Sequence, residues 1–128
     1  MATLLPNTIV KQKVWLRDLK DIRLLKEDWD DAGAPCINKV AIDNANKFAL
    51  TLGCAVAKLI RLFPTHLGAV MLKLETEKGR IKCEIGDTQM SYFVKREGSE
   101  TVHHSFEAIN DDSLMVLRSN LESIYKHY

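Results

Sequence analysis

The hydrophobic pattern of the chain changes at Pro64 from a helical period to a period of two, and this change constrains the fold more than any other feature. After Pro64, apolar residues occupy every second position in four segments, which the short turn sequences EKGR, GD and REGSE separate. Connections this short join only antiparallel neighbours, because a parallel crossover needs about a dozen residues or more. We therefore predict a four-stranded antiparallel meander over residues 68–106.

Alternation also predicts which side chains of the meander face the core. The inward set is Val70, Leu72, Leu74, Ile81, Cys83, Ile85, Met90, Tyr92, Val94, Val102, His104 and Phe106. His103 and His104 are adjacent, so their side chains point to opposite faces and cannot hold a metal ion together from one side. We expect His104 in the core, His103 in solvent, and Cys83 buried and unreactive.

Helical periodicity marks three other segments. Apolar residues recur at steps of three and four over residues 15–25, 41–52 and 114–124. Asn38 is placed to cap the second of these helices, and the polar run 110–112 is placed to open the third. Residues 54–63 fit either a helix or a strand, and the spacing of their apolar residues leans towards a helix.

The length and the order of these elements predict the architecture. A chain of 128 residues can bury a core without disulfides or metal ions. We predict one α+β domain over residues 1–128, with two N-terminal helices, the four-stranded meander and a C-terminal helix, and with the helices packed on one sheet face. Cys36, Cys54 and Cys83 match neither a disulfide framework nor a zinc motif, so reduced thiols are expected.

The charge balance disfavours nucleic acid and membrane surfaces as partners. Eighteen Lys and Arg against seventeen Asp and Glu leave a formal net charge of +1, which provides no global field towards a polyanion. The start MATLLPNTIVKQKV lacks the regions of a secretory signal, and no apolar run is long enough to span a membrane. These features predict a cytoplasmic protein.

The stretch EDWDDAGAPC, residues 27–36, concentrates acidic charge around one tryptophan. Its residues Glu27, Asp28, Asp30 and Asp31 surround Trp29 with no basic residue among them. Two interpretations stay open. The stretch is either a solvated turn in which Trp29 packs against the first helix, or a contact surface for a partner with a basic site.

A calcium loop is a third interpretation, and the spacing disfavours it. Counting from Asp28, Asp30 takes position 3 and Gly33 takes position 6, as an EF-hand requires. Position 5 is then Ala32 and position 12 is Lys39, so two ligands are missing. We expect neither a metal site nor a cofactor.

An enzyme is disfavoured, because no G-x-S-x-G, H-E-x-x-H or phosphate-loop motif occurs. The alternative that stays open is a small hydrolase or transferase that uses Asp30 with His66 or His104 in a cleft. A second alternative is a nucleic-acid-binding regulator that uses the outer sheet face. That face would carry Lys73, Arg80, Lys82, Phe93, Lys95 and Arg96. Glutamates beside these residues favour a mixed-charge solvated face instead.

Three stretches, LLKEDWDDAGAPCI, FPTHLGAVMLKLE and CEIGDTQMSYF, resemble a group of small bacterial proteins with a Trp-Asp-Gly-Tyr-Gly-Ala-Pro-Pro motif, a later Pro-Thr-x-x-Gly and an Ile-Gly-Asp-Thr strand end. The resemblance covers residues 24–93. Asp31, Ala32 and Cys36 replace the Gly, the Tyr and the second Pro of the first motif. The resemblance implies the order helix, loop, helix, sheet, and it brings no activity with it.

These observations predict a non-catalytic, cytoplasmic bacterial protein that binds another protein, as a toxin-neutralising immunity protein or an antitoxin does. The predicted contact residues are Glu27, Asp28, Trp29, Asp30 and Asp31. An exposed acidic loop of this kind acts mainly on the rate and the specificity of association with a basic partner.

Overall fold

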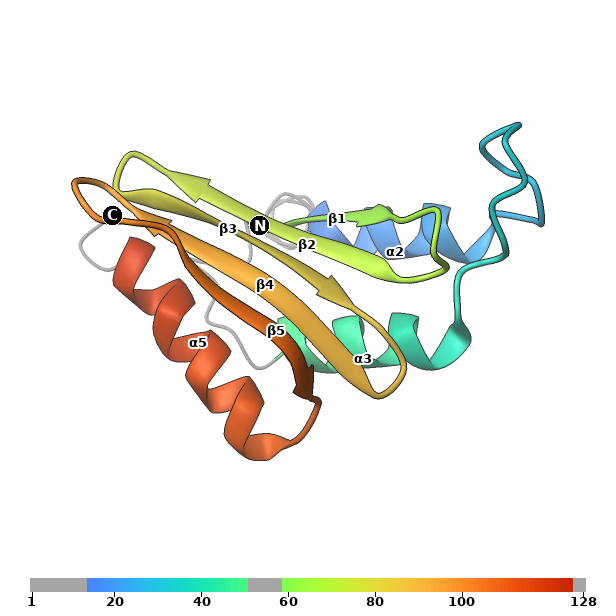
Figure 1. The fold of residues 1–128 in the computed structure, drawn as a ribbon. Helices are drawn as coiled ribbons and strands as arrows, with labels where there is room; N and C mark the ends of the chain where they lie inside the picture. Colours follow the sequence, from blue (N-terminus) through green and yellow to red (C-terminus); the bar gives the residue numbers. More distant parts are fainter. Residues whose placement is uncertain (1–13, 51–58, 126–128) are drawn as a thin grey trace, which may run out of the picture.

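The computed structural model describes residues 14–50 and 59–125, which form three helices and a five-stranded sheet. The strands cross the sheet in chain order, and every neighbouring pair is antiparallel (Figure 1). The elements are α2 (Val14–Arg23), α3 (Lys39–Leu50), β1 (Arg61–Pro64), β2 (Val70–Thr76), β3 (Gly79–Ile85), β4 (Gln89–Arg96), β5 (Val102–Ala108) and α5 (Asp111–Tyr125). The α+β class and the antiparallel meander over residues 68–106 are confirmed.

Strand β1 corrects the predicted number of strands. The helical leaning for residues 54–63 is wrong at its end, where Arg61–Pro64 pairs with β2, while residues 54–58 lie outside the described part. Asp18 of α2 holds this short strand in place. Its carboxylate accepts a hydrogen bond of 2.9 Å from the Leu62 N–H and bonds of 3.0 and 3.1 Å from the Arg61 guanidinium. A four-residue strand is too short for its alternation to outweigh a helical spacing in the sequence.

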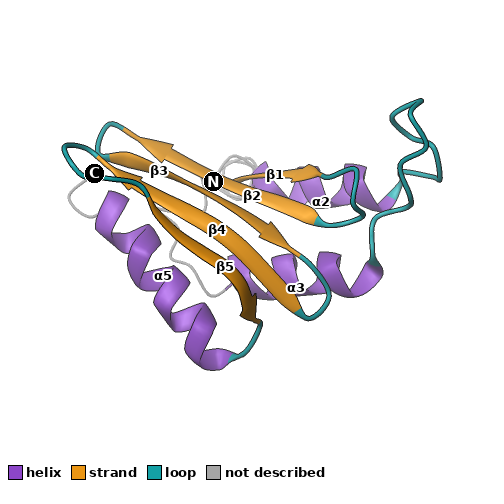
Figure 2. Ribbon diagram, viewed as in Figure 1, coloured by secondary structure: helices purple, strands orange, loops and turns teal. Residues whose placement is uncertain are grey.

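The described helices cover one face of the sheet, as predicted (Figure 2). Every second side chain of β2, β3 and β4 is buried, and these side chains form the core with the apolar stripes of the helices. Ala41, Ala45 and Ala49 on α3 are buried, and their small size lets this helix pack closely.

None of the described helices covers the opposite face, and we call it the open sheet face. Its side chains are Arg61, Phe63, Met71, Lys73, Glu75, Arg80, Lys82, Glu84, Ser91, Phe93, Lys95 and His103.

Both predicted helix starts are capped as the sequence indicates. Asn38 Oδ1 accepts hydrogen bonds from the N–H groups of Val40 and Ala41, at 2.8 and 3.1 Å. Asn110 and Ser113 cap α5 reciprocally, because each backbone N–H donates to the side-chain oxygen of the other residue, at 3.0 and 2.9 Å. These bonds satisfy donors that the first turn of a helix leaves without intrahelical partners.

Strand β5 departs from the predicted inward set. Val102 is 47% exposed and Phe106 is 76% exposed, so neither belongs to the core. The pairing of β4 with β5 shifts between Met90 and Tyr92, and Phe106 has a φ of 54°. This irregularity breaks the strict alternation on which the prediction for Phe106 rested. Val102 stays in register with the core residue Val94, and it is exposed at the start of an edge strand.

The two adjacent histidines do point to opposite faces, as predicted. His104 is half-buried and stacks on Tyr92 of the helix-covered face, with ring centroids 4.5 Å apart. His103 lies against Phe93 of the open sheet face, with centroids 6.1 Å apart. Among the described residues, no helix is long and apolar enough to cross a membrane.

Candidate functional site

The loop that contains Trp29 and the turn that contains Gly68 are packed against each other. The Asn38 N–H donates a hydrogen bond of 2.7 Å to the Gly68 carbonyl oxygen. Gly68 has a φ of 83°, and a Cβ atom there would lie 3.3 Å from the Cys36 carbonyl oxygen and 3.4 Å from Pro35 Cγ. The first two stretches that carry the sequence resemblance therefore meet at one end of the sheet.

The residues PTHLG, 64–68, form a tight turn around the buried Thr65. The Thr65 N–H donates to the Ala69 carbonyl at 2.9 Å, and the Ala69 N–H donates to Thr65 Oγ1 at 3.1 Å. The Gly68 N–H also donates to the Thr65 carbonyl, at 3.0 Å. These bonds leave His66 and Leu67 exposed at the tip of the turn.

The third stretch reaches the same end of the molecule. Asn44 of α3 donates through Nδ2 to the carbonyl oxygens of Gly86 and Asp87, at 3.0 and 2.9 Å. Because Val70 at the start of β2 pairs with Ile85 at the end of β3, this β3–β4 turn lies beside the PTHLG turn. All three stretches thus lie together at one end of the sheet.

The acidic loop is held by its own carboxylates. Asp30 Oδ1 accepts hydrogen bonds from the N–H groups of Ala32 and Ala34, at 2.9 and 3.0 Å. Asp28 Oδ1 accepts a bond from the Gly33 N–H at 2.6 Å. The backbone N–H groups of Ala34 and Ala32 favour the charged form of Asp30, and they hold the pKa of this carboxyl below its ordinary value.

The five predicted contact residues therefore divide into two groups. Asp28 and Asp30 shape the loop, and Trp29 anchors it by packing against the core and donating from Nε1 to the Pro35 carbonyl at 3.0 Å. Glu27 and Asp31 are exposed and face solvent. Only this second pair leaves its carboxylates available to a partner at no cost to the loop.

A hollow of about 480 Å³ lies between this loop and the open sheet face. It is lined by Trp29, Asp30, Phe63, Pro64, Thr65, His66, Met71, Lys73, Lys82 and Glu84. The floor comes from β1, β2 and β3, and the wall comes from the two packed loops. From the sequence, the acidic stretch indicated only the residues of the wall. The floor residues come together through the pairing of β1, β2 and β3, which the sequence pattern does not show.

Two smaller hollows extend this site across the sheet. One of about 230 Å³ borders Phe93, Ser91 and His103, and one of about 210 Å³ borders the β3–β4 turn and Phe106. Glu84 lines all three hollows. The open sheet face is therefore an uneven surface with several adjoining depressions.

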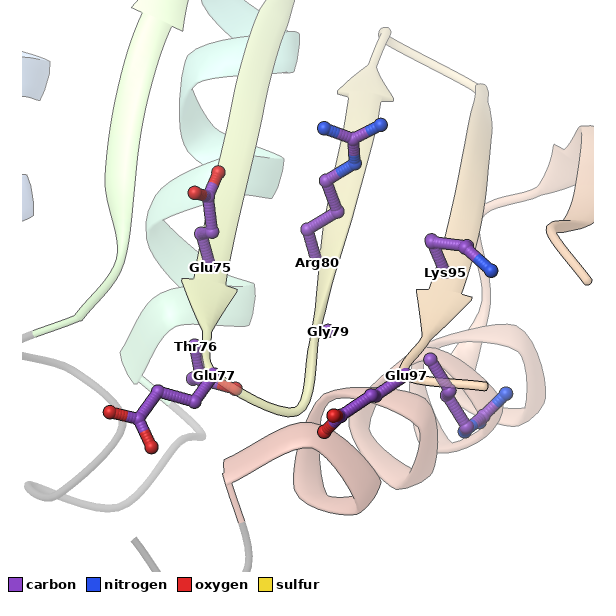
Figure 3. A pocket seen from close by; sticks show the side chains of 8 residues that line it. Glu75, Thr76, Glu77, Gly79, Arg80, Lys95 and Glu97 are labelled. Carbon is purple, nitrogen blue, oxygen red and sulfur yellow. The ribbon is translucent and has the colours of Figure 1, made fainter. Parts of the chain in front are cut away.

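Charge on the open sheet face is arranged in rows across the strands. One row contains an acid, with Glu75, Arg80 and Lys95 opposite one another in register, and these three side chains stand beside a hollow at the far end of the sheet (Figure 3). The next row contains Arg61, Lys73, Lys82, Phe93 and His103. That second row carries cations without an intervening acid.

Arg96 does not belong to this face, although the sequence suggested that it does. Its guanidinium donates to Ser123 Oγ at 3.0 Å and to Asn120 Oδ1 at 2.8 Å, both on α5. The even-numbered positions of β4 face the helices, and Arg96 follows this alternation.

The candidate catalytic groups are only partly brought together. Asp30 and His66 line the same hollow, whereas His104 lies on the helix-covered face. The lowered pKa of Asp30 makes this carboxylate a weak general base. Cys83 is fully buried, and burial raises the pKa of its thiol, so it is not a nucleophile.

Among residues 14–50 and 59–125, no three His, Cys, Asp or Glu side chains converge to hold a metal ion. Comparison with known protein families, with curated proteins and with solved structures gives no match.

Proposed function

We propose that the chain is a non-catalytic protein-binding protein, of the kind represented by immunity proteins and antitoxins, and that its partner docks on the open sheet face beside the Trp29 loop. The observation that carries this proposal is the apolar border of the hollows. Phe63 is 40% exposed and Phe106 is 76% exposed, and the half-buried Trp29 stands between core and solvent.

Such a border suits a protein interface. Aromatic side chains in or beside depressions supply much of the binding energy at protein contacts, since they bury large apolar areas with few rotatable bonds. The remaining surface of the face mixes charged and apolar groups, which is typical of interfaces between proteins that also exist separately. A rigid antiparallel sheet keeps these groups in place before the partner arrives.

The acidic loop has a separate part in this proposal. Glu27 and Asp31 are exposed, and they flank in sequence the residues Trp29 and Asp30 that line the hollow of about 480 Å³, so we expect them to attract a basic region of the partner during encounter. Their effect falls on the association rate and weakens with added salt, because exposed charges are screened within about 10 Å at moderate ionic strength.

A site-specific crosslinking experiment tests the proposal. A photoreactive amino acid replaces Phe63 in the full chain in its native host, and the same substitution at Leu16 of α2 is the matched control, since the two residues are 40% and 42% exposed. We expect one protein to crosslink at position 63 and not at position 16. That protein, once purified, should bind the wild-type chain, and Phe63→Ser should weaken binding.

Three results would contradict the proposal. They are equal crosslinking at both positions, no protein crosslinked at position 63, and a purified candidate whose affinity does not change on Phe63→Ser. Enzymatic turnover of a small molecule that Asp30→Asn or His66→Asn abolishes would favour the hydrolase or transferase alternative instead.

A further inference from the structure

Lys73 and Lys82 face each other directly on the open sheet face. They are register partners on β2 and β3, and Arg61 on β1 is the next register partner of Lys73. Like charges directly opposite in an antiparallel pair destabilise the sheet. This row of cations therefore lowers the stability of the fold.

The fold neutralises the Arg61 end of this row better than its centre. Asp18 binds the Arg61 guanidinium through two hydrogen bonds. Lys73 has only an exposed contact of 3.7 Å to Glu75. Within the described ranges, no carboxylate lies within 4.0 Å of the Lys82 ammonium. Of the two facing lysines, Lys82 thus has no acidic partner within 4.0 Å among the described residues, and Lys73 has a single long, exposed one.

The two lysines also line the hollow of about 480 Å³ beside Trp29. Its apolar parts come from Trp29, Phe63 and Met71, and its two carboxylates are Asp30 and Glu84. An anionic group between the two ammonium groups would offset their repulsion. The neighbouring carboxylates would repel a second anion close by, which disfavours a polyphosphate chain and favours an isolated acid in a polypeptide.

We infer that Lys73 and Lys82 bind an acidic side chain of the partner protein, an Asp or Glu flanked by apolar or basic residues, in the hollow beside Trp29. The inference rests on the proposed function, because it names the chemistry of the same contact. Glu27 and Asp31 then attract basic groups of the partner while the lysine pair binds an acidic group, so a partner must present both charges in the correct arrangement.

Selection of random linear peptides displayed on phage, with the full chain as target, tests this chemistry without knowledge of the partner. We expect the selected peptides to be enriched in Asp or Glu next to apolar residues. A synthetic selected peptide should bind K73E/K82E and K73Q/K82Q at least about tenfold more weakly than wild type. Replacing its acid by the amide should have a similar effect.

The matched control is K20E/K47E, which makes the same change in net charge at exposed positions of α2 and α3. Its affinity should stay within roughly twofold of wild type, because distant exposed charges contribute little. Circular dichroism melts of all variants show whether each one folds.

Selected peptides without acids, acidic peptides that bind K73E/K82E as well as wild type, or no peptide binding at all would overturn the inference. Tight binding of a single-stranded oligonucleotide with a steep salt dependence would overturn it in favour of nucleic acid. If the photoreactive residue at position 63 crosslinks no protein, the proposed function itself is contradicted. If it does crosslink a protein and one of these peptide or oligonucleotide results is obtained, only the role assigned to Lys73 and Lys82 is contradicted.

Discussion

The backbone N–H of Asn38 donates a 2.7 Å hydrogen bond to the carbonyl oxygen of Gly68, across 30 positions of sequence. This bond joins the acidic loop to the PTHLG turn, and residues of both segments form the wall of the hollow of about 480 Å³. Its geometry depends on the positive φ of Gly68 and on the lack of a side chain there.

Gly68→Ala should therefore destabilise the protein more than Gly33→Ala. Both glycines have nearly the same φ, 83° and 85°, so both variants lose about 1–2 kcal/mol from backbone strain. Only position 68 adds a close contact with Cys36, since a Cβ atom at position 33 meets nothing within 4 Å. Urea unfolding of the two variants measures the difference, and equal losses would show that the two loops separate easily.

Asp18→Ala should cost about 1.5–3 kcal/mol of unfolding free energy, because it removes a charged acceptor from the Leu62 N–H and from Arg61. The Asp18 side chain is only 10% exposed, so water replaces it poorly. Asp21→Ala on the same helix is the control, and its exposed side chain should change stability by less than about 0.5 kcal/mol. Denaturant titration measures both, and amide exchange at Leu62 should increase only in the first variant.

Asp30 should make the stability of the loop dependent on acid pH. Its folded pKa is held below the ordinary 3.8 by the N–H groups of Ala34 and Ala32, so its contribution is present above that ordinary value. The contribution is lost as the pH falls from that value through the lowered folded pKa. Asp30→Asn should remove this part of the acid dependence, and an NMR titration of the Asp30 carboxyl in the native protein should give a value below 3.8.

Asp31→Asn is the control for that experiment. Its carboxylate accepts no hydrogen bond within the described loop, so the variant should keep the acid dependence of the wild type. If Asp30→Asn and Asp31→Asn behave alike, the loop bonds do not have the proposed role.

K82E should stabilise the fold by about 0.2–1 kcal/mol, since it replaces a like-charge pair with Lys73 by an opposite pair. K73E should gain less, because it also removes the contact of Lys73 with Glu75. K73E/K82E should lose the gain, because two like charges face each other again. Thermal melts of the three variants form a double-mutant cycle. If the stability change of the double variant equals the sum of the two single changes, the two lysines do not interact.

The meander and the helices could be predicted from local patterns. Alternation along residues 70–94 indicates half-buried strands, and short turns between them leave only antiparallel pairing. Asn38 caps its helix as expected, because capping involves residues within one turn of chain. The edges of the sheet were predicted less well. Strand β1 has only four residues, and a pairing irregularity in β5 exposes Phe106.

Only some properties of the acidic loop could be predicted from its sequence. Its composition indicated charge around Trp29, and Trp29 does act as an anchor. Composition could not show that Asp28 and Asp30 bond to amides of their own loop whereas Glu27 and Asp31 face water. The positive φ angles of Asp28 and Asp31 are likewise a property of the folded loop, and composition does not indicate them.

By itself, the sequence determined the three described helices, the strands β2 to β4 and the apolar side chains that each of them buries, because these follow from the spacing of residues close together in the chain. Only the tertiary structure decided that three distant stretches meet at one end of the sheet, that the open sheet face is hollowed there, and that Lys73 and Lys82 stand opposite each other. Strand register and loop packing join residues far apart in sequence, and a pattern along the chain does not contain them.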